Sequence, residues 1–379
     1  MITRPWLTAR VWVPIFAVAA VLLAPPGTTL NSSYGAFWLA AGLVLVAAIG
    51  RTQQWAAITA TSLSTAAALV FAIGNLVVIA RGGTATRWLV VIGALVVIAL
   101  GVWRLTISRR TDPLLLIAVQ LSVGIATEWV FFQVSGLALD YHSFGRESLP
   151  TLAGTELSVV ALAFAGVGLG VWRTWRPAIE RLGWKAPTWW QVALALLAAE
   201  LLSLSAIPAN ILTYFLTPQA YYALAANSQH IFGDLPWWTF PFVAILAGVG
   251  EETLFRGAVQ PRFGIVVSAA LFAMLHANYG FTPILGMVFV HGLAYGLMRR
   301  HLNTTTPAIA HATYDFGAYV RIGYGSHFVL AVILALLLAA PAWRHRLHIS
   351  GTLRQGFMED WRGILDRPWR SRPSSTDLS

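Results

Sequence analysis

The sequence predicts an all-α fold, a polytopic transmembrane helical bundle of about twelve spans. Hydrophobic residues make up 57% of the 379 residues and charged residues only 11%, against roughly a quarter charged in ordinary globular chains. Apolar runs long enough to cross a bilayer recur from Val11 to Trp343. These two observations exclude a soluble globular protein and predict an integral membrane protein.

Each apolar run is bounded by polar, glycine or proline residues, which sets its limits to within about three residues. The predicted spans are 11–26, 35–50, 57–80, 88–103, 114–138, 152–172, 188–212, 238–260, 263–278, 283–298, 305–320 and 327–343. Pro25 and Pro26 follow the first run in place of a small-residue cleavage site, so we expect a retained span and not a signal peptide.

Basic residues gather in short clusters between the apolar runs, as expected where cytoplasmic loops keep Lys and Arg beside anionic lipid. Their balance predicts that both termini are cytoplasmic. The long loop from Leu212 to Trp237 has no Lys or Arg and is expected outside. Because the net charge of +10 is dispersed in this way, it indicates contact with membrane lipid and argues against nucleic-acid binding.

Acidic residues divide the chain into two parts. No Asp or Glu precedes Asp112, whereas the second half places ionisable residues inside its apolar runs. A polar hinge from Arg173 to Trp184 separates the parts. We expect an N-terminal transmembrane domain of about six spans at 1–180, a chemically active core of about six spans at 185–345, and a basic cytoplasmic tail at 346–379.

Ionisable residues inside a bilayer are costly, so each one in these spans is a candidate site residue. The candidates lie in GVGEETLFRG, LFAMLH and HATYD, and are Glu251, Glu252, Arg256, His276, His311 and Asp315. Helical spacing of four residues places Glu252 and Arg256 on one face, and likewise His311 and Asp315. Glu251 lies about 100° round the helix from Glu252 and is free to point elsewhere.

The depth of these residues supports a common site. If the chain turns at the cytoplasmic surface near Arg262, Glu251 lies ~16 Å deep and His276 ~21 Å deep at about 1.5 Å per residue. The same rise places His311 at ~9 Å and Asp315 at ~15 Å. The three segments are therefore expected to meet in the cytoplasmic half of the membrane.

Two kinds of chemistry fit such a cluster. A carboxylate beside an imidazole can take a proton from water and so produce a nucleophile, while a second imidazole and a carboxylic acid stabilise an oxyanion. Alternatively, one Glu, two His and one Asp have the donor types for zinc with an open position for water. The chain has no cysteine, which excludes disulfides and a cysteine nucleophile.

The three segments resemble the motifs of a known family. EETLFR resembles the EExxxR motif, FAMLH, with Phe272 and His276, resembles FxxxH, and HATYD resembles a His followed four residues later by Asn or Asp. The family is that of the CAAX proteases and bacteriocin-processing proteins (CPBP, Abi), the type II CAAX prenyl endopeptidases and their bacterial relatives. The resemblance covers about 188–343 and includes the order and rough spacing of the motifs.

The resemblance implies an intramembrane endopeptidase in a bacterial-type plasma membrane. Glu251 would be the catalytic carboxylate, and His276 would assist it in activating water. Glu252 and Arg256 would shape the site. The expected substrate is an extended peptide or a membrane-protein segment, and nothing in the sequence indicates a prenylated partner.

The third motif would supply the oxyanion site through His311 and Asp315. Asp315 stands where the family often has Asn, and it can donate a hydrogen bond only when protonated, a form that burial beside Glu251 favours. Relatives have been called metalloproteases, and a metal ion such as zinc would be held by Glu251, His276, His311 and Asp315. A metal-independent mechanism with no cofactor is the expectation that we favour.

Two other functions fit the composition. About twelve spans are common in secondary transporters, but the acid-free early spans and chemistry confined to one half argue against transport. A catalytically inactive scaffold or immunity protein of the same fold is the second alternative, and the intact Glu251, His276 and His311 argue against it.

Each remaining ionisable residue has a simpler interpretation. The spacing of Glu252 and Arg256 is itself typical of a structural ion pair. His291 has no motif partner and is expected to be structural. The other acids in spans are expected to bond neighbouring helices, and two residues of the outside loop to be solvated: Glu128, Glu156, Glu200, His230 and Asp234.

Overall fold

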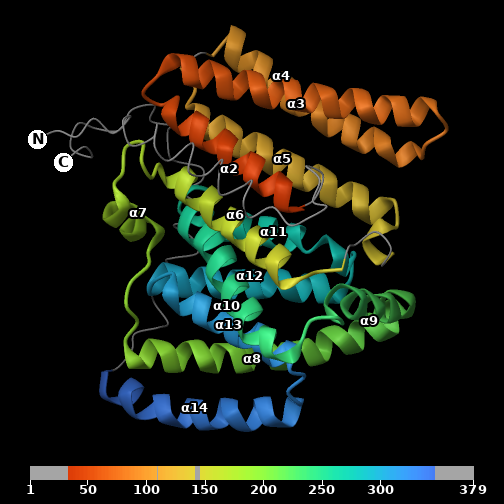
Figure 1. Cartoon of the computed structure of the whole chain (residues 1–379). Coiled ribbons are helices and arrows are strands. Elements are labelled where there is room, and N and C mark those ends of the chain that lie inside the picture. The colour runs from red at the N-terminus through yellow and green to blue at the C-terminus, as the bar shows by residue number, and fades with distance from the viewer. Residues whose placement is uncertain (1–32, 109, 141–145, 346–379) are drawn as a thin grey trace, which may run out of the picture.

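The computed structural model describes residues 33–108, 110–140 and 146–345, which fold almost entirely into helices (Figure 1). Within these residues there is no β-strand, and six helices are long and apolar enough to cross a membrane, with two shorter apolar helices beside them. The predicted all-α, polytopic transmembrane fold is therefore confirmed. The first predicted span (11–26) and the tail (346–379) lie outside the described residues.

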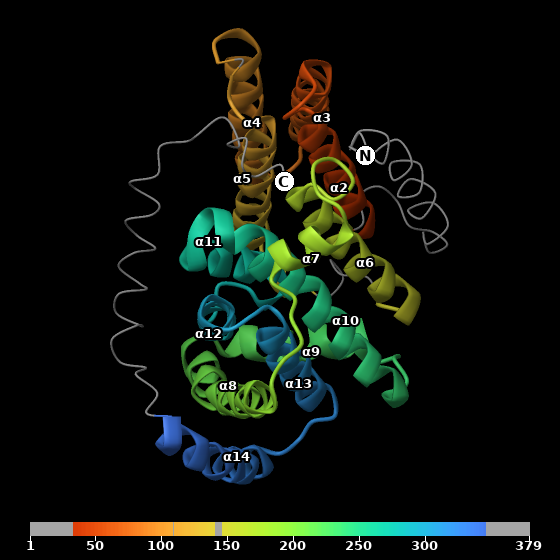
Figure 2. The ribbon, with the colours of Figure 1, turned by 90° about the vertical axis from the view of Figure 1, so that its left-hand side faces the viewer.

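The N-terminal half forms a set of long apolar helices at one end of the molecule (Figures 1 and 2). They are α2 (Ser33–Ile49), α3 (Gln54–Ala80), α4 (Trp88–Thr106), α5 (Pro113–Val134) and α6 (Leu149–Val167). Helices α3 and α4 pack as a hairpin, and α2 packs on α6. Large apolar side chains such as Val70 and Phe71 remain exposed on α3, as expected of a helix that faces lipid.

Polar side chains join these N-terminal helices to one another. The buried Arg104 of α4 donates hydrogen bonds to Thr61 Oγ1 (3.1 Å) and to the Ala57 carbonyl (3.3 Å) of α3. Ser64 of α3 donates to Gln120 Oε1 of α5 (2.9 Å), and Gln120 Nε2 donates to a carbonyl of α4 (2.9 Å). Within an apolar environment such bonds tie helices together because the alternative is an unsatisfied polar group.

The C-terminal half surrounds a second, more polar core. Its helices are α7 (Trp175–Leu182), α8 (Trp189–Leu216), α9 (Pro218–Phe232), α10 (Phe240–Glu252), the π-helix η5 (Thr253–Val259), α11 (Gln260–Leu275), α12 (Pro283–His301), α13 (Thr305–Tyr319) and α14 (Tyr324–His345). Short 3-10 turns lie between helices at Ala85–Arg87, Leu137–Leu139, Trp237–Thr239 and Ala277–Tyr279. Helices α10 to α13 lie centrally, α8 covers one side of them, and α14 packs on the outer side of α8 (Figure 1).

The segment from Leu212 to Trp237 was predicted to be a loop, and this prediction is wrong because the segment is mostly helical. Helix α8 continues to Leu216, and α9 (Pro218–Phe232) follows after a single residue. Proline at the first position of α9 suits a helix start, and Leu224, Asn227 and Ile231 provide a buried face at helical spacing. The mixture of Tyr, Asn and Gln in this segment hid its helical periodicity.

The predicted hinge from Arg173 to Trp184 is a packed segment. It contains α7, and the Trp184 indole donates a hydrogen bond to Thr253 Oγ1 in η5 (3.1 Å). Thr304, just before α13, donates from its hydroxyl to the Leu182 carbonyl (2.5 Å) and from its backbone to the Gly183 carbonyl (2.9 Å). The segment therefore fixes the positions of η5 and α13, which carry two of the three motifs.

Candidate active site

Glycine residues of α10 bring the motif-bearing helices together. A Cβ added at Gly248 would lie only 2.8 Å from the Ala308 carbonyl oxygen of α13, closer than real Cβ atoms approach. Glycine therefore allows the two helix backbones to meet, as small residues do in membrane helix packing. The contact places Glu251 and Glu252, at the end of α10, opposite His311 in α13.

The helix with the first motif changes geometry directly after Glu252. The seven residues of η5 form a π-helix, a rare form that occurs frequently at functional sites. Side-chain hydroxyls bond its carbonyls and those beside it: Thr253 Oγ1 donates to Val249 (2.6 Å), and Ser268 Oγ of α11 donates to Phe255 (2.9 Å). Beyond η5 the helix breaks at Gly264, whose φ of 82° suits glycine, so the chain turns close to the predicted position.

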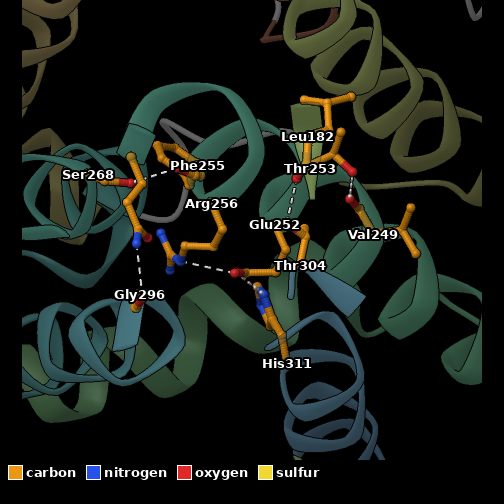
Figure 3. Close-up of polar contacts among 11 residues, drawn as sticks. Leu182, Val249, Glu252, Thr253, Phe255, Arg256, Ser268, Gly296, Thr304 and His311 are labelled. Carbon is orange, nitrogen blue, oxygen red and sulfur yellow. Dashed lines mark hydrogen bonds and ion pairs between the residues drawn. The ribbon is translucent and has the colours of Figure 1, made fainter. Parts of the chain in front are cut away.

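Glu252 joins two of the motifs. One carboxylate oxygen lies 3.0 Å from Arg256 Nε, and the other accepts a hydrogen bond from His311 Nδ1 at 3.2 Å (Figure 3). Glu252 and Arg256 are both fully buried. The predicted pairing on one helix face is present, and the carboxylate also orients the imidazole of the third motif.

Arg256 lies among aromatic rings. Its guanidinium carbon is 4.8 Å from the centre of the Phe272 ring and 5.7 Å from that of Tyr295. Ring faces attract a cation, more strongly where water is excluded. The two terminal nitrogens of Arg256 have no hydrogen-bond partner within the described part of the chain. The ion pair with Glu252 and the rings of Phe272 and Tyr295 are therefore the contacts that stabilise this buried charge.

The first and last residues of the second motif, Phe272 and His276, both contribute to the site. Phe272 supplies the ring beneath Arg256, and its carbonyl oxygen lies 2.9 Å from Nδ1 of His276, four residues later. Because a carbonyl only accepts, Nδ1 carries the proton, and in the neutral ring Nε2 keeps its lone pair. His276 lies at the end of α11, where the helical dihedral angles stop, and stacks on Tyr279 with ring centres 5.7 Å apart. The motif thus presents an imidazole nitrogen that can accept a proton.

His311 and Asp315 lie one turn apart in α13. The His311 ring stacks on Tyr295, with centres 5.1 Å apart and planes 18° from parallel. Its Nε2 is 3.5 Å from Asp315 Oδ2, which is an ion-pair contact and too long for a good hydrogen bond. His311 is buried, whereas the Asp315 side chain keeps 19% exposure. His311 therefore belongs to the buried group formed with Glu252 and Arg256, which we call the frame, and Asp315 lies at a more exposed position beside it.

Two carboxyl groups beside this frame lack partners. Glu251 Oε2 and Glu156 Oε2 are both buried without a hydrogen bond to any described residue. Glu156 belongs to α6, outside the predicted core, and we had expected it to bond a neighbouring helix. It instead lies against Gly250 of α10 and within electrostatic range of Glu251 and Asp315. The sequence offered one signal for it, an acid inside an apolar span.

The other ionisable residues of the core lie in separate contacts. His291 of α12 is buried, and its Nε2 is 2.9 Å from Ser205 Oγ of α8. Glu200 of α8 pairs with His327 of α14, so this acid bonds a neighbouring helix as expected. Asp234 pairs with Arg146 in an exposed contact. These hydrogen bonds and ion pairs include no residue of the three motifs, although the His291 ring also packs edge-on against Tyr314 of the third motif, with centres 4.8 Å apart.

The site contains groups that are held by one another and groups that are free to react. Glu252, Arg256 and His311 hold one another, whereas Glu251 Oε2 and His276 Nε2 remain able to accept protons. The donor types would suit zinc, but among the described residues no three His, Asp or Glu side chains are placed to share one metal ion. The placement therefore does not fit a preformed metal site.

Comparison with known proteins gives one match. Residues 233–317 match the family model of the type II CAAX prenyl endopeptidase Rce1-like proteins. This segment contains all three motifs and confirms the resemblance inferred from them. No curated protein and no solved structure matches the chain.

Proposed function

We propose, from the membership of residues 233–317 in the Rce1-like family of type II CAAX prenyl endopeptidases, that this membrane protein is an intramembrane endopeptidase. The observation that carries the proposal is the contrast within the site. A frame of paired groups, with Glu252 between Arg256 and His311, surrounds groups that are free to act on water. Such a division into supporting and reacting groups is what a preorganised hydrolytic site requires.

In the proposed reaction, Glu251 and His276 activate water. The Glu251 carboxylate takes one proton of a water molecule that His276 Nε2 helps to orient, and the water oxygen forms a bond to the carbonyl carbon of the peptide. The electron pair of the carbonyl double bond moves to its oxygen. When this intermediate collapses, the carbon–nitrogen bond breaks and the proton held by Glu251 passes to the leaving amine.

His311 and Asp315 are proposed to stabilise the oxyanion. Nδ1 of His311 is occupied by Glu252, so a doubly protonated ring would direct its Nε2–H toward the developing charge. Protonated Asp315 would add a second donor. In this scheme Glu252 and Arg256 touch no substrate and keep His311 in its orientation.

The proposed substrate is an extended peptide or a membrane-protein segment. It would enter from the cytoplasmic side or laterally from the lipid, because the reacting groups lie within the helical bundle. Prenylation of the substrate is not part of the proposal. We also propose that the reaction needs no metal.

The test compares cleavage of a peptide pool by purified wild type, Glu251→Ala and His276→Ala. Each substitution is expected to reduce kcat by about 10²–10⁴-fold, the usual contribution of a general acid or base. Glu128→Ala in α5 is the matched control, since it also removes an intramembrane acid, and it is expected to retain activity. Addition of a strong chelator is expected to leave the rate unchanged.

Two results would contradict the proposal in different ways. Equal cleavage by wild type and Glu251→Ala would exclude the mechanism. A folded wild type that cleaves no member of the pool would favour the inactive scaffold of the same fold. Loss of activity with the chelator, restored by zinc, would exclude only the metal-free part.

A further inference from the structure

The carboxyl group of Glu156 lies against the backbone of α10 at the position before Glu251. A Cβ added at Gly250 would be 2.1 Å from Glu156 Oε2 and 3.2 Å from its carboxyl carbon. Glycine at 250 therefore provides the space that this side chain occupies. Helix α6 packs along both α10 and η5, so the contact belongs to an extended helix interface.

Among the residues that the structure describes, Glu156 has no hydrogen-bond partner that would explain its burial. Glu156 Oε2 has no hydrogen bond to any described residue, and the same holds for Glu251 Oε2. A buried carboxylate without a partner carries a large cost, which a proton or a donor removes. Glu200, another buried acid outside the motifs, does have such a partner in His327.

Several groups face this position from the surrounding elements. Glu251 on α10 and Asp315 on α13 lie within electrostatic range of Glu156, and Glu156 lies within the same range of Tyr319. The further titratable groups around this cluster are Glu252, Arg256, His276, Tyr279 and His311. Helix α2, which also packs on α6, contributes no acid, lysine, arginine or histidine. The arginine of the first motif, Arg256, is already paired with Glu252.

We propose that Glu156 is a further carboxyl group of the site, which positions Glu251 by sharing one proton with it. This inference rests on the proposed function of Glu251. Two carboxyl groups within electrostatic range of each other in a medium of low dielectric constant resist double ionisation, so a single proton shared by the pair removes the cost. The neutral member donates a hydrogen bond to the carboxylate, and both unpartnered oxygens are satisfied. Glu156 is thus a positioning residue, and α6 is part of the active site.

The experiment measures kcat and KM against pH for wild type, Glu156→Gln and Glu156→Ala. Glu156→Gln keeps a donor for Glu251 but cannot titrate, so it is expected to retain kcat within about threefold at the optimum and to lose the alkaline decline that ionisation of the second carboxyl causes. Glu156→Ala is expected to lower kcat by about 10–100-fold with KM unchanged, because Glu251 loses its orientation. Glu128→Gln is the control and is expected to follow the wild-type profile.

Infrared spectroscopy gives a second measurement that does not depend on proteolysis. At neutral pH the wild type is expected to show one more neutral carboxylic-acid band than Glu156→Gln. Wild-type values of kcat, pH profile and infrared spectrum in the folded Glu156 variants would overturn this inference. That outcome, together with loss of cleavage in Glu251→Ala, would leave the proposed function intact, whereas activity in Glu251→Ala would contradict the proposed function itself.

Discussion

Two buried arginines show how differently the two halves of the molecule use charge. Arg104 in α4 donates to Thr61, to the Ala57 carbonyl and to the Thr111 carbonyl (3.3 Å), so its hydrogen-bonding groups are largely satisfied. Arg256 in η5 has one carboxylate and a group of aromatic rings, and its terminal nitrogens have no partner among the described residues. Both side chains are almost completely buried.

The difference separates polar groups that hold helices from polar groups that do chemistry. A satisfied network such as that of Arg104 contributes to packing and leaves no capacity for a ligand. Around Arg256, buried groups with unused donors or acceptors gather in and beside the first motif, at Glu251, Arg256, Gln260 and Tyr295, and such groups are costly for stability alone. Unused hydrogen-bonding capacity in the membrane core therefore marks the candidate site better than burial of charge does.

The largest expected effect on stability comes from Glu252→Ala. This change leaves the buried Arg256 without its carboxylate, and removal of one partner from a buried pair costs about 3–5 kcal/mol. Unfolding of the purified protein in detergent, followed by denaturant titration, measures it. Glu251→Ala is the matched control on the adjacent residue and is expected to lower the free energy of unfolding by no more than about 1.5 kcal/mol, since it breaks no ion pair and the one hydrogen bond proposed with Glu156 contributes only about 0.5–1.5 kcal/mol. Equal costs for the two variants would remove the distinction between paired and unpaired acids.

A smaller effect is expected from Arg104→Leu. The variant loses three hydrogen bonds but also removes a buried charge, so these terms partly offset and the net cost is about 1–2 kcal/mol. The same denaturant titration measures the stability, and peptide cleavage per folded molecule is expected to equal that of wild type. A loss of kcat with normal stability would show that the N-terminal network contributes to the reaction.

The smallest effect concerns Glu147, an unpaired acid outside the membrane spans. Burial raises the pKa of this carboxyl, so the folded state holds its proton more tightly than the unfolded state does. Its contribution to stability is therefore present below the unfolded pKa and is lost as pH rises through the folded pKa. Glu147→Gln is expected to flatten the dependence of the melting temperature on pH above about 4.5 and to leave kcat unchanged. Identical pH slopes for the variant and wild type would contradict this assignment.

Much of the fold could be predicted from the sequence because lipid imposes a simple pattern. Long apolar runs can cross a bilayer only as helices, and the predicted spans from 35–50 to 327–343 correspond to α2–α6, α8 and α10–α14 with small shifts at their ends. Helix α9 was missed because its polar and aromatic residues give a weak apolar signal. The packing of α7 and Trp184 was missed because a polar linker and a docked segment have similar compositions.

The site could be predicted only where its residues are neighbours in sequence. Four-residue spacing identified the Glu252–Arg256 pair and the common face of His311 and Asp315. The bond between Glu252 and His311 depends on how α10 crosses α13, and spacing along one helix carries no information about that crossing. Glu156 shows the same limit, since its position depends on the packing of α6 against Gly250.

The π-helix η5 changes the direction in which the following side chains point around the helix axis, and a count of residues alone does not predict this change. An α-helix turns by about 100° per residue, and a π-helix turns by less, so over its seven residues the rotation falls behind by about the step of one residue. The residues between η5 and the break at Gly264 inherit this offset, including Gln260, which is buried and donates to the Gly296 carbonyl of α12 (2.9 Å). The register of the first motif against α12 is thus set in turns as well as in residues. Deletion of one residue within 253–259 would rotate Gln260 away from that carbonyl.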